Sequence, residues 1–150
     1  MFLLAACGST PAEGPALTFD PCEVTTIEVV NGSAAQAASV DDAIAMWRDR
    51  GIVDLVRGEP AQLSIEFRDA GAAFYGFYDD TTARVFVNTS LVDDEQRAVT
   101  IAHELGHAIG LLHVTDRVSV MNPGNLAITP TPDDVSALEM LWGTCVSAPP

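Results

Sequence analysis

The sequence HELGHAIGLLH, residues 103–113, is the stretch that decides the fold. His103 and His107 are four residues apart, so on a helix they lie on one face, one turn apart, where two imidazoles can bind one Zn²⁺. Glu104 lies beside them and is placed to accept a proton from a zinc-activated water. Gly110 can adopt a left-handed conformation and end the helix, so that His113 can reach the same metal. Three nitrogen ligands leave a fourth position open, which is typical of catalytic zinc.

The sequence contains three histidines, and all three lie in this stretch. A single histidine is more often a hydrogen-bonded core residue than a metal ligand. Three histidines in these registers, together with Glu104 and Gly110, favour a metal site over that alternative.

The length of 150 residues predicts one domain that buries about 70% of its unfolded surface. An apolar fraction of 48% is ordinary for a globular protein. The chain has 21 acidic and 7 basic residues, which gives a net charge of −14. The seven basic residues are all arginine. Such a surface repels phosphate backbones and anionic lipid, so we expect no nucleic-acid partner.

The N-terminal Leu4-Ala5-Ala6-Cys7 resembles the lipobox of bacterial lipoproteins, in which the cysteine is lipidated. Residues 1–21 are therefore expected to be a truncated lipoprotein signal with its lipobox, followed by a flexible linker over residues 8–21. A lipid on Cys7 would anchor the protein to a membrane, and the location would be extracytoplasmic, in a bacterial cell envelope or secreted. The alternatives are an accidental match, or a cysteine that caps zinc in a latent enzyme.

Residue patterns predict an α+β domain over residues 22–147. Alternating and β-branched segments predict strands at residues 24–30, 52–56, 63–67, 73–78 and 84–88. Helices are expected at residues 39–50 with Ser39 as N-cap, from 93 to about 109, and from 131 to 142. We therefore expect a twisted mixed sheet of four or five strands with an antiparallel edge strand, a long N-terminal helix, an active-site helix and a C-terminal helix.

Cys22 and Cys145 flank this compact region. A disulfide between them would tie the first strand to the end of the last helix and would require an oxidising compartment. Two free thiols are the alternative.

The motif resembles that of the metzincin zinc endopeptidases. Met121, in Ser-Val-Met-Asn-Pro eight residues after His113, and a final Pro-Asp-Asp-Val…Leu-Trp-Gly segment make the resemblance matrixin-like. The resemblance implies a metzincin-like zincin fold and one catalytic Zn²⁺ on His103, His107 and His113. It also implies that Met121 lies in a tight turn beneath the histidines without binding the metal.

Two positions depart from the matrixin pattern: Val114 replaces the usual serine, and Asn122 replaces the usual tyrosine before Pro123. Together with Tyr75 on the expected edge strand, these residues are the predicted substrate pocket. Calcium could bind among a group of acidic residues, although solvated carboxylates are the preferred interpretation. These residues are Asp79, Asp80, Asp93 and Asp94.

The predicted function is that of a monomeric zinc-dependent endopeptidase, with Glu104 as general base and proteins or peptides as substrates. One alternative is a catalytically inactive, zinc-containing surface domain that binds a partner protein. Another is a site with an acidic third ligand such as Glu139 in place of His113.

Overall fold

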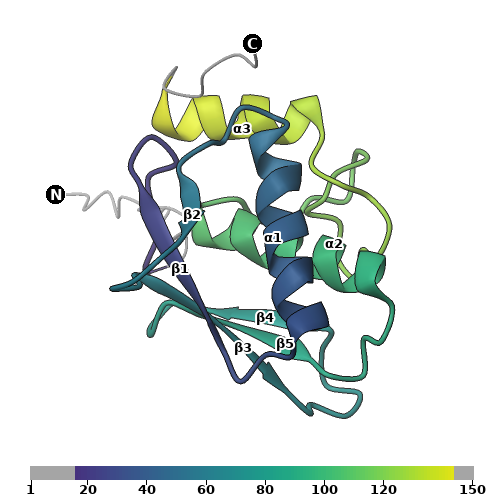
Figure 1. Ribbon diagram of the computed structural model, residues 1–150. Helices are drawn as coiled ribbons and strands as arrows, with labels where there is room; N and C mark the ends of the chain where they lie inside the picture. Colours follow the sequence, from purple (N-terminus) through teal and green to yellow (C-terminus); the bar gives the residue numbers. More distant parts are fainter. Residues whose placement is uncertain (1–15, 144–150) are drawn as a thin grey trace, which may run out of the picture.

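The computed structural model describes residues 16–143, which form five strands and three helices (Figure 1). The strands are β1 (Thr25–Val30), β2 (Leu55–Arg57), β3 (Leu63–Arg68), β4 (Gly76–Asp79) and β5 (Arg84–Asn88). The helices are α1 (Ala34–Arg48), α2 (Asp94–Ala108) and α3 (Pro132–Trp142). The predicted α+β class is confirmed.

The five strands form one mixed sheet in the order β2-β1-β3-β5-β4. β1 pairs in parallel with β2 and β3, and β3 pairs in parallel with β5. The crossover through α1 returns the chain in the same direction, whereas the short turn between β4 and β5 makes that pair antiparallel. β4 is therefore the antiparallel edge strand that the sequence predicts.

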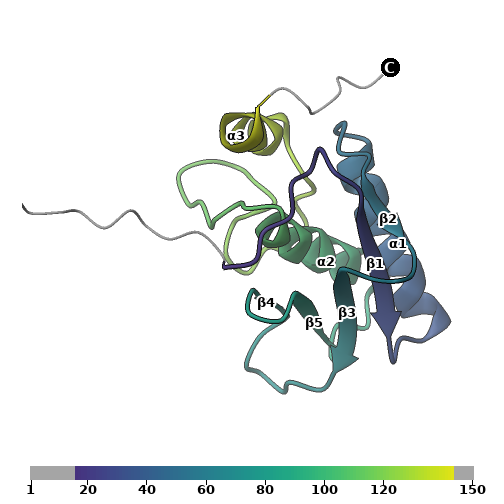
Figure 2. The ribbon, with the colours of Figure 1, turned by 90° about the vertical axis from the view of Figure 1, so that its left-hand side faces the viewer.

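Helix α2 is the element that connects the sheet to the metal-binding residues. It lies between α3 on one side and strands β4 and β5 on the other (Figures 1 and 2). Ile101, Leu105 and Ile109 are fully buried on its apolar side, and each such side chain stabilises the fold by about 1.5–3 kcal/mol. The indole Nε1 of Trp47 on α1 donates to the carbonyl oxygen of Ala102 at 2.9 Å. These contacts hold α2 in place through its apolar side. The side that carries His103 and His107 is not used for this packing.

The start of α1 differs from the prediction. Its N-cap is Ser33, which accepts from the backbone N–H of Gln36, while the Gln36 side chain accepts from the Ser33 N–H. This capping box satisfies the first N–H groups six residues before the predicted cap. Ser39 instead lies inside the helix, buried, and its hydroxyl donates to the carbonyl oxygen of Ala35.

The edge strand is shorter than the predicted 73–78 segment and begins at Gly76. The residues before it form a turn whose carbonyl groups bond to Asn88: Nδ2 of Asn88 donates to the oxygens of Gly71 and Phe74, both at 2.8 Å. The backbone N–H of Asn88 donates to the oxygen of Tyr75. One buried asparagine therefore supplies the bonds that a longer strand would have used.

Residues 16–21 do not behave as the predicted flexible linker. The phenol of Tyr78 donates to the carbonyl oxygen of Leu17 at 2.6 Å, and the N–H of Phe19 donates to the oxygen of Ala108 at 2.8 Å. Burial and the neighbouring Asp80 and Asp79 raise the pKa of Tyr78 to about 12, so its hydroxyl remains a donor. This segment therefore packs between β4 and the end of α2.

None of the described helices is both long and apolar enough to cross a membrane. Cys7 and Cys145 lie outside the described residues, so the lipid anchor and the Cys22–Cys145 disulfide stay predictions.

Candidate metal centre and active-site cavity

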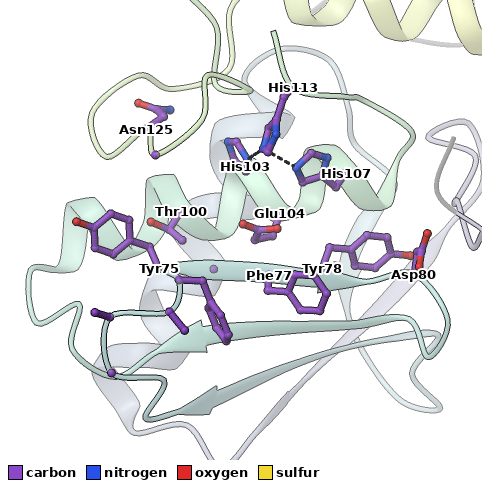
Figure 3. A pocket seen from close by; sticks show the side chains of 16 residues that line it. Tyr75, Phe77, Tyr78, Asp80, Thr100, His103, Glu104, His107, His113 and Asn125 are labelled. Carbon is purple, nitrogen blue, oxygen red and sulfur yellow. Dashed lines mark hydrogen bonds between the residues drawn. The ribbon is translucent and has the colours of Figure 1, made fainter. Parts of the chain in front are cut away.

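The three histidines converge through their Nε2 atoms (Figure 3). His103 and His107 project from neighbouring turns of α2, and Gly110, at φ 103°, lets the chain reverse so that His113 returns to them. The Nε2 atom of His113 lies 3.0 Å from that of His103 and 3.2 Å from that of His107. The predicted ligand group is thus assembled in space.

Backbone carbonyl groups orient two of these rings. Nδ1 of His103 donates to the oxygen of Val120 at 2.7 Å, and Nδ1 of His107 donates to the oxygen of Leu111 at 2.8 Å. A carbonyl oxygen only accepts, so both rings carry the proton on Nδ1 and direct the Nε2 lone pair inward. Burial lowers the pKa of His103, and it lowers that of His107 to about 4. Both imidazoles are therefore in the neutral form that binds metal.

This donor set fits zinc. Two nitrogen ligands of tetrahedral zinc lie roughly 3.3 Å apart, since each Zn–N bond is about 2.0–2.1 Å long, and the observed separations of 3.0 and 3.2 Å are close to that. An N–H on His113 could bond to only one of the two facing lone pairs at a time. A cation at the centre would satisfy all three nitrogens, and three imidazoles are typical of catalytic zinc.

Glu104 lies next to this centre and is almost fully buried, at 5% exposure. Burial raises its pKa to about 8, although a hydrogen bond from the backbone of Tyr78 opposes the shift. A divalent cation on the histidines would lower the pKa again, because an opposite charge favours the carboxylate. The group is thus able to exchange a proton near neutral pH.

Strand β4 approaches Glu104 closely because residue 76 is glycine. A Cβ atom at Gly76 would lie 2.8 Å from both Cγ and Oε1 of Glu104 and 2.7 Å from Cγ2 of Thr100. No larger residue fits this position without displacing one of those side chains. Gly76 therefore sets the gap between the edge strand and the carboxyl group of Glu104.

A cavity of about 710 Å³ opens in front of the histidines. The turn before β4, the edge strand, α2 and the segment after Met121 form its walls. The lining side chains labelled in Figure 3 are Tyr75, Phe77, Tyr78, Asp80, Thr100, His103, Glu104, His107, His113 and Asn125. His103, Glu104 and His107 on α2 and His113 after it thus all line the same cavity.

Met121 is buried beneath α2, at 1% exposure. A Cβ atom at Gly106 would lie only 2.4 Å from Sδ of Met121, so the methionine contacts the helix backbone itself. The preceding Val120 accepts the hydrogen bond of His103, which places the turn directly behind the ligands. The position agrees with the expected turn beneath the histidines.

Asp134 is a functional residue that the sequence reasoning missed. It is completely buried near the start of α3 and accepts hydrogen bonds from the hydroxyl of Ser119 and the N–H of Val120. It also accepts from the N–H and hydroxyl of Thr131. Asp134 therefore connects α3 to the turn that orients His103. The Asp133-Asp134 pair in the sequence predicts only a helix start, and a buried role leaves no further signal in the sequence.

Of the predicted pocket residues, Tyr75 lines the cavity, whereas Val114, Asn122 and Pro123 do not. Nδ2 of Asn122 donates to the carbonyl oxygens of Val114 and Arg117, at 2.8 and 2.9 Å. Asn122 thus supports the loop rather than the pocket wall. Gly124 and Asn125, two and three residues after Asn122, supply that wall instead.

The other candidate ligands have different partners. Asp79 accepts from Thr81 and Thr82, Asp80 from the N–H of Ala16, and Asp93 caps α2, while Asp94 pairs with Arg97. Within residues 16–143, the three histidines are the one cluster that could hold a metal ion. Glu139 on α3 is not part of that cluster.

Comparison with known proteins found one matching family model and similar solved structures. Residues 92–143 match the family model described as matrixin, which covers α2, Met121 and α3. The chain is similar to the structure of myroilysin, with 17% identity and a TM-score of 0.49 over 65% of this chain and 52% of that one. It therefore spans about half the length of that chain. No curated protein matches the sequence. Residues 92–143, which carry the three histidines, are thus similar to the matrixin family.

Proposed function

We propose that this protein is a zinc-dependent endopeptidase that hydrolyses proteins or peptides. The observation that carries the proposal is the convergence of three Nε2 atoms beside a buried glutamate in an open cavity. The matrixin match over residues 92–143 supports it.

Each residue of the site has a defined part in this reaction. Zinc on His103, His107 and His113 would activate a water molecule and stabilise negative charge on the scissile carbonyl oxygen. Glu104 accepts a proton from the attacking water and donates it to the amine nitrogen as the C–N bond breaks. The carbonyl groups of Val120 and Leu111 hold the imidazoles of His103 and His107 in position throughout.

The substrate binds as an extended strand along β4. Among the described strands, β4 pairs with β5 alone, so its second edge pairs with no strand, although the Tyr78 backbone on that edge bonds to Glu104. An extended peptide can add to such an edge through backbone hydrogen bonds, which accept many sequences. In Figure 3 β4 runs below α2 from Tyr75 past Tyr78, so a peptide on this edge passes in front of Glu104.

The direct test is casein cleavage by Glu104→Gln, with Glu95→Gln as the matched control. Glu95 is exposed on the same helix and lies outside the cavity. We expect Glu104→Gln to retain bound zinc and to lose cleavage by at least about 10²-fold, whereas Glu95→Gln cleaves like the wild type. Cleavage by Glu104→Gln at the wild-type rate would overturn the mechanism. A zinc-loaded wild type that cleaves no substrate would favour the partner-binding alternative.

A further inference from the structure

Asp80 places a carboxylate at one end of the active-site cavity. It follows strand β4 and lines the cavity, and Figure 3 shows it beyond Tyr78, at the opposite end from Tyr75. Its side chain is partly exposed. Among the described residues that line the cavity, Glu104 is the one other acid, and the proposed reaction uses it for proton transfer. The carboxylate of Asp80 is therefore available to contact a substrate.

This carboxylate is held in place without being neutralised. Its Oδ2 accepts from the backbone N–H of Ala16 at 2.8 Å, in a bond that is exposed to solvent. The hydroxyl of Tyr78 donates to the carbonyl oxygen of Leu17 instead. Within residues 16–143, no arginine forms an ion pair with Asp80. The carboxylate therefore keeps acceptor capacity for a further donor.

The neighbouring Asp79 is engaged in the turn that follows β4. Its carboxylate accepts from the hydroxyls of Thr81 and Thr82, at 2.6 and 2.7 Å, and it does not line the cavity. Burial, and then the charges of Asp80 and Asp79, raise the pKa of Tyr78 to about 12. The negative charge at this end thus acts on the cavity wall, where it would stabilise a positive charge on a substrate.

No positively charged side chain in the cavity compensates this charge. The chain has no lysine, and none of its seven arginines lines the cavity. The chain as a whole has a net charge of −14, which attracts cationic ligands and repels anionic ones. The local and the overall charge therefore favour the same kind of substrate, a basic one.

The position of Asp80 along β4 fits a substrate residue near the scissile bond. The backbone of Tyr78 bonds to Glu104, so Tyr78 marks the level of the reacting group. Asp80 lies two residues farther on, which corresponds to about 7 Å along a strand. A peptide strand paired with β4 would lie about 4.8 Å from it. The long side chain of a lysine or arginine about two residues from the cut can span this separation.

We propose that Asp80 determines specificity: its carboxylate binds the side chain of a lysine or arginine about two residues from the scissile bond, at the Asp80 end of the cavity. This inference rests on the proposed endopeptidase function and makes basic proteins or peptides its substrates. The bond from Ala16 fixes the carboxylate before the substrate arrives, so that less ordering is needed on binding.

The test is cleavage of a peptide library by zinc-loaded wild type, Asp80→Asn and Asp80→Lys. The peptides are blocked at both ends, so that side chains are the only source of positive charge. We expect the wild type to prefer Lys or Arg over Gln at one position near the cut. Asp80→Asn keeps an oxygen that can accept from Ala16, and it should lower kcat/KM for the basic residue about 3- to 10-fold. Asp80→Lys should favour Asp or Glu at that position instead.

Asp42→Asn is the matched control. It removes the same charge from an exposed position on α1, outside the cavity, and its cleavage profile should equal that of the wild type. Each variant is compared on a basic peptide and its Gln analogue, so a loss of folded protein does not change the ratio.

Binding gives a second readout that needs no cleavage. Fluorescence anisotropy would compare a labelled Lys-containing peptide with its Gln analogue on zinc-loaded Glu104→Gln. We expect the basic peptide to bind more tightly, and the difference to decrease at high salt and when Asp80→Asn is added.

Three results would overturn this inference alone. They are a wild-type profile without a basic preference, a preference that Asp80→Asn leaves unchanged, and an equal loss in Asp42→Asn. Absence of all cleavage by the zinc-loaded wild type would instead overturn the proposed function, and this inference with it.

Discussion

Two glycines control how closely other parts of the chain approach α2. Gly106 admits the sulfur of Met121 on one side of the helix. On strand β4, Gly76 admits the side chains of Thr100 and Glu104. Both glycines permit these close contacts because they lack a Cβ atom. Substitution by alanine, which adds only that atom, therefore tests each position.

Gly106→Ala should push Met121 away from α2 and disturb the adjacent carbonyl group of Val120, which orients His103. Overpacking of this kind costs about 1–3 kcal/mol of unfolding free energy, and we expect weaker zinc binding with it. Urea unfolding and a zinc competition titration measure the two effects. Gly58→Ala is the control, since its Cβ atom would make only an ordinary 3.4 Å contact with Thr26. Equal effects of the two substitutions would contradict this account.

Gly76→Ala should affect turnover more than metal binding. The new methyl group would displace Glu104 from its place beside the metal centre, and a misplacement of about 1 Å can cost 10²-fold in rate. We expect kcat to fall by about 10-fold or more with zinc content unchanged. Unaltered kcat would show that Glu104 tolerates a different position.

Helix α3 contributes to the site although its described residues do not line the cavity. Its start carries Asp134, whose carboxylate receives four hydrogen bonds and connects the helix to Ser119 and Val120. From there one further bond leads to the ring of His103. The orientation of His103 thus depends on a helix that does not line the cavity.

Asp134→Ala should therefore destabilise the fold and weaken zinc binding together. Several buried donors would lose their acceptor, and we expect a loss of about 3–5 kcal/mol in unfolding free energy. Asp133→Ala is the matched control, because Asp133 is the exposed neighbour in the same helical turn. Its removal should cost less than about 1 kcal/mol through the helix dipole alone. Comparable losses in the two variants would show that the buried bonds are not the cause.

The elements that the sequence predicts well are those with local signals. The acidic N-terminus of α2 and the Thr-Pro start of α3 define their boundaries through capping, which involves neighbouring residues. The histidine spacing likewise requires only helix geometry. The positions of Asp134, Asp80 and Asn125 in the site depend on contacts between distant segments, and a single sequence does not contain that information. The start of α1 differs from the prediction for a local reason, the Ser-x-x-Gln capping box of Ser33 and Gln36.

Zinc should also contribute to the stability of the whole domain. The metal would connect α2 to the loop that carries His113, and a ligand that binds the native state alone stabilises it by about 4 kcal/mol at a concentration 1,000 times its Kd. We expect a chelator to lower the Tm and zinc to restore it. His113→Ala should abolish that response, because it removes the ligand outside α2. A Tm that changes neither with the chelator nor with added zinc would contradict zinc binding at this site.

The predicted disulfide would likewise affect the stability of the whole domain. If Cys22 and Cys145 are bonded, the chain-entropy model predicts a contribution of roughly 4–5 kcal/mol for so long a loop. We expect an intact-mass measurement after alkylation to find both thiols protected before reduction and both modified after it. Alkylation of both cysteines in the unreduced protein would exclude the bond. The same measurement would reveal any lipid on Cys7.

The free edge of β4 has a consequence for how copies of the protein behave in concentrated solution. An unpaired strand that can align a foreign peptide can equally align the same strand of a second copy, and such edges promote aggregation. Here the strand is only four residues long and ends at Asp79, beside Asp80, on a chain with a net charge of −14. We therefore expect mutual repulsion to keep the edges of two copies apart, and screening by high salt to weaken this protection. The negative net charge is thus expected to oppose aggregation through β4, the edge on which we propose that a peptide binds.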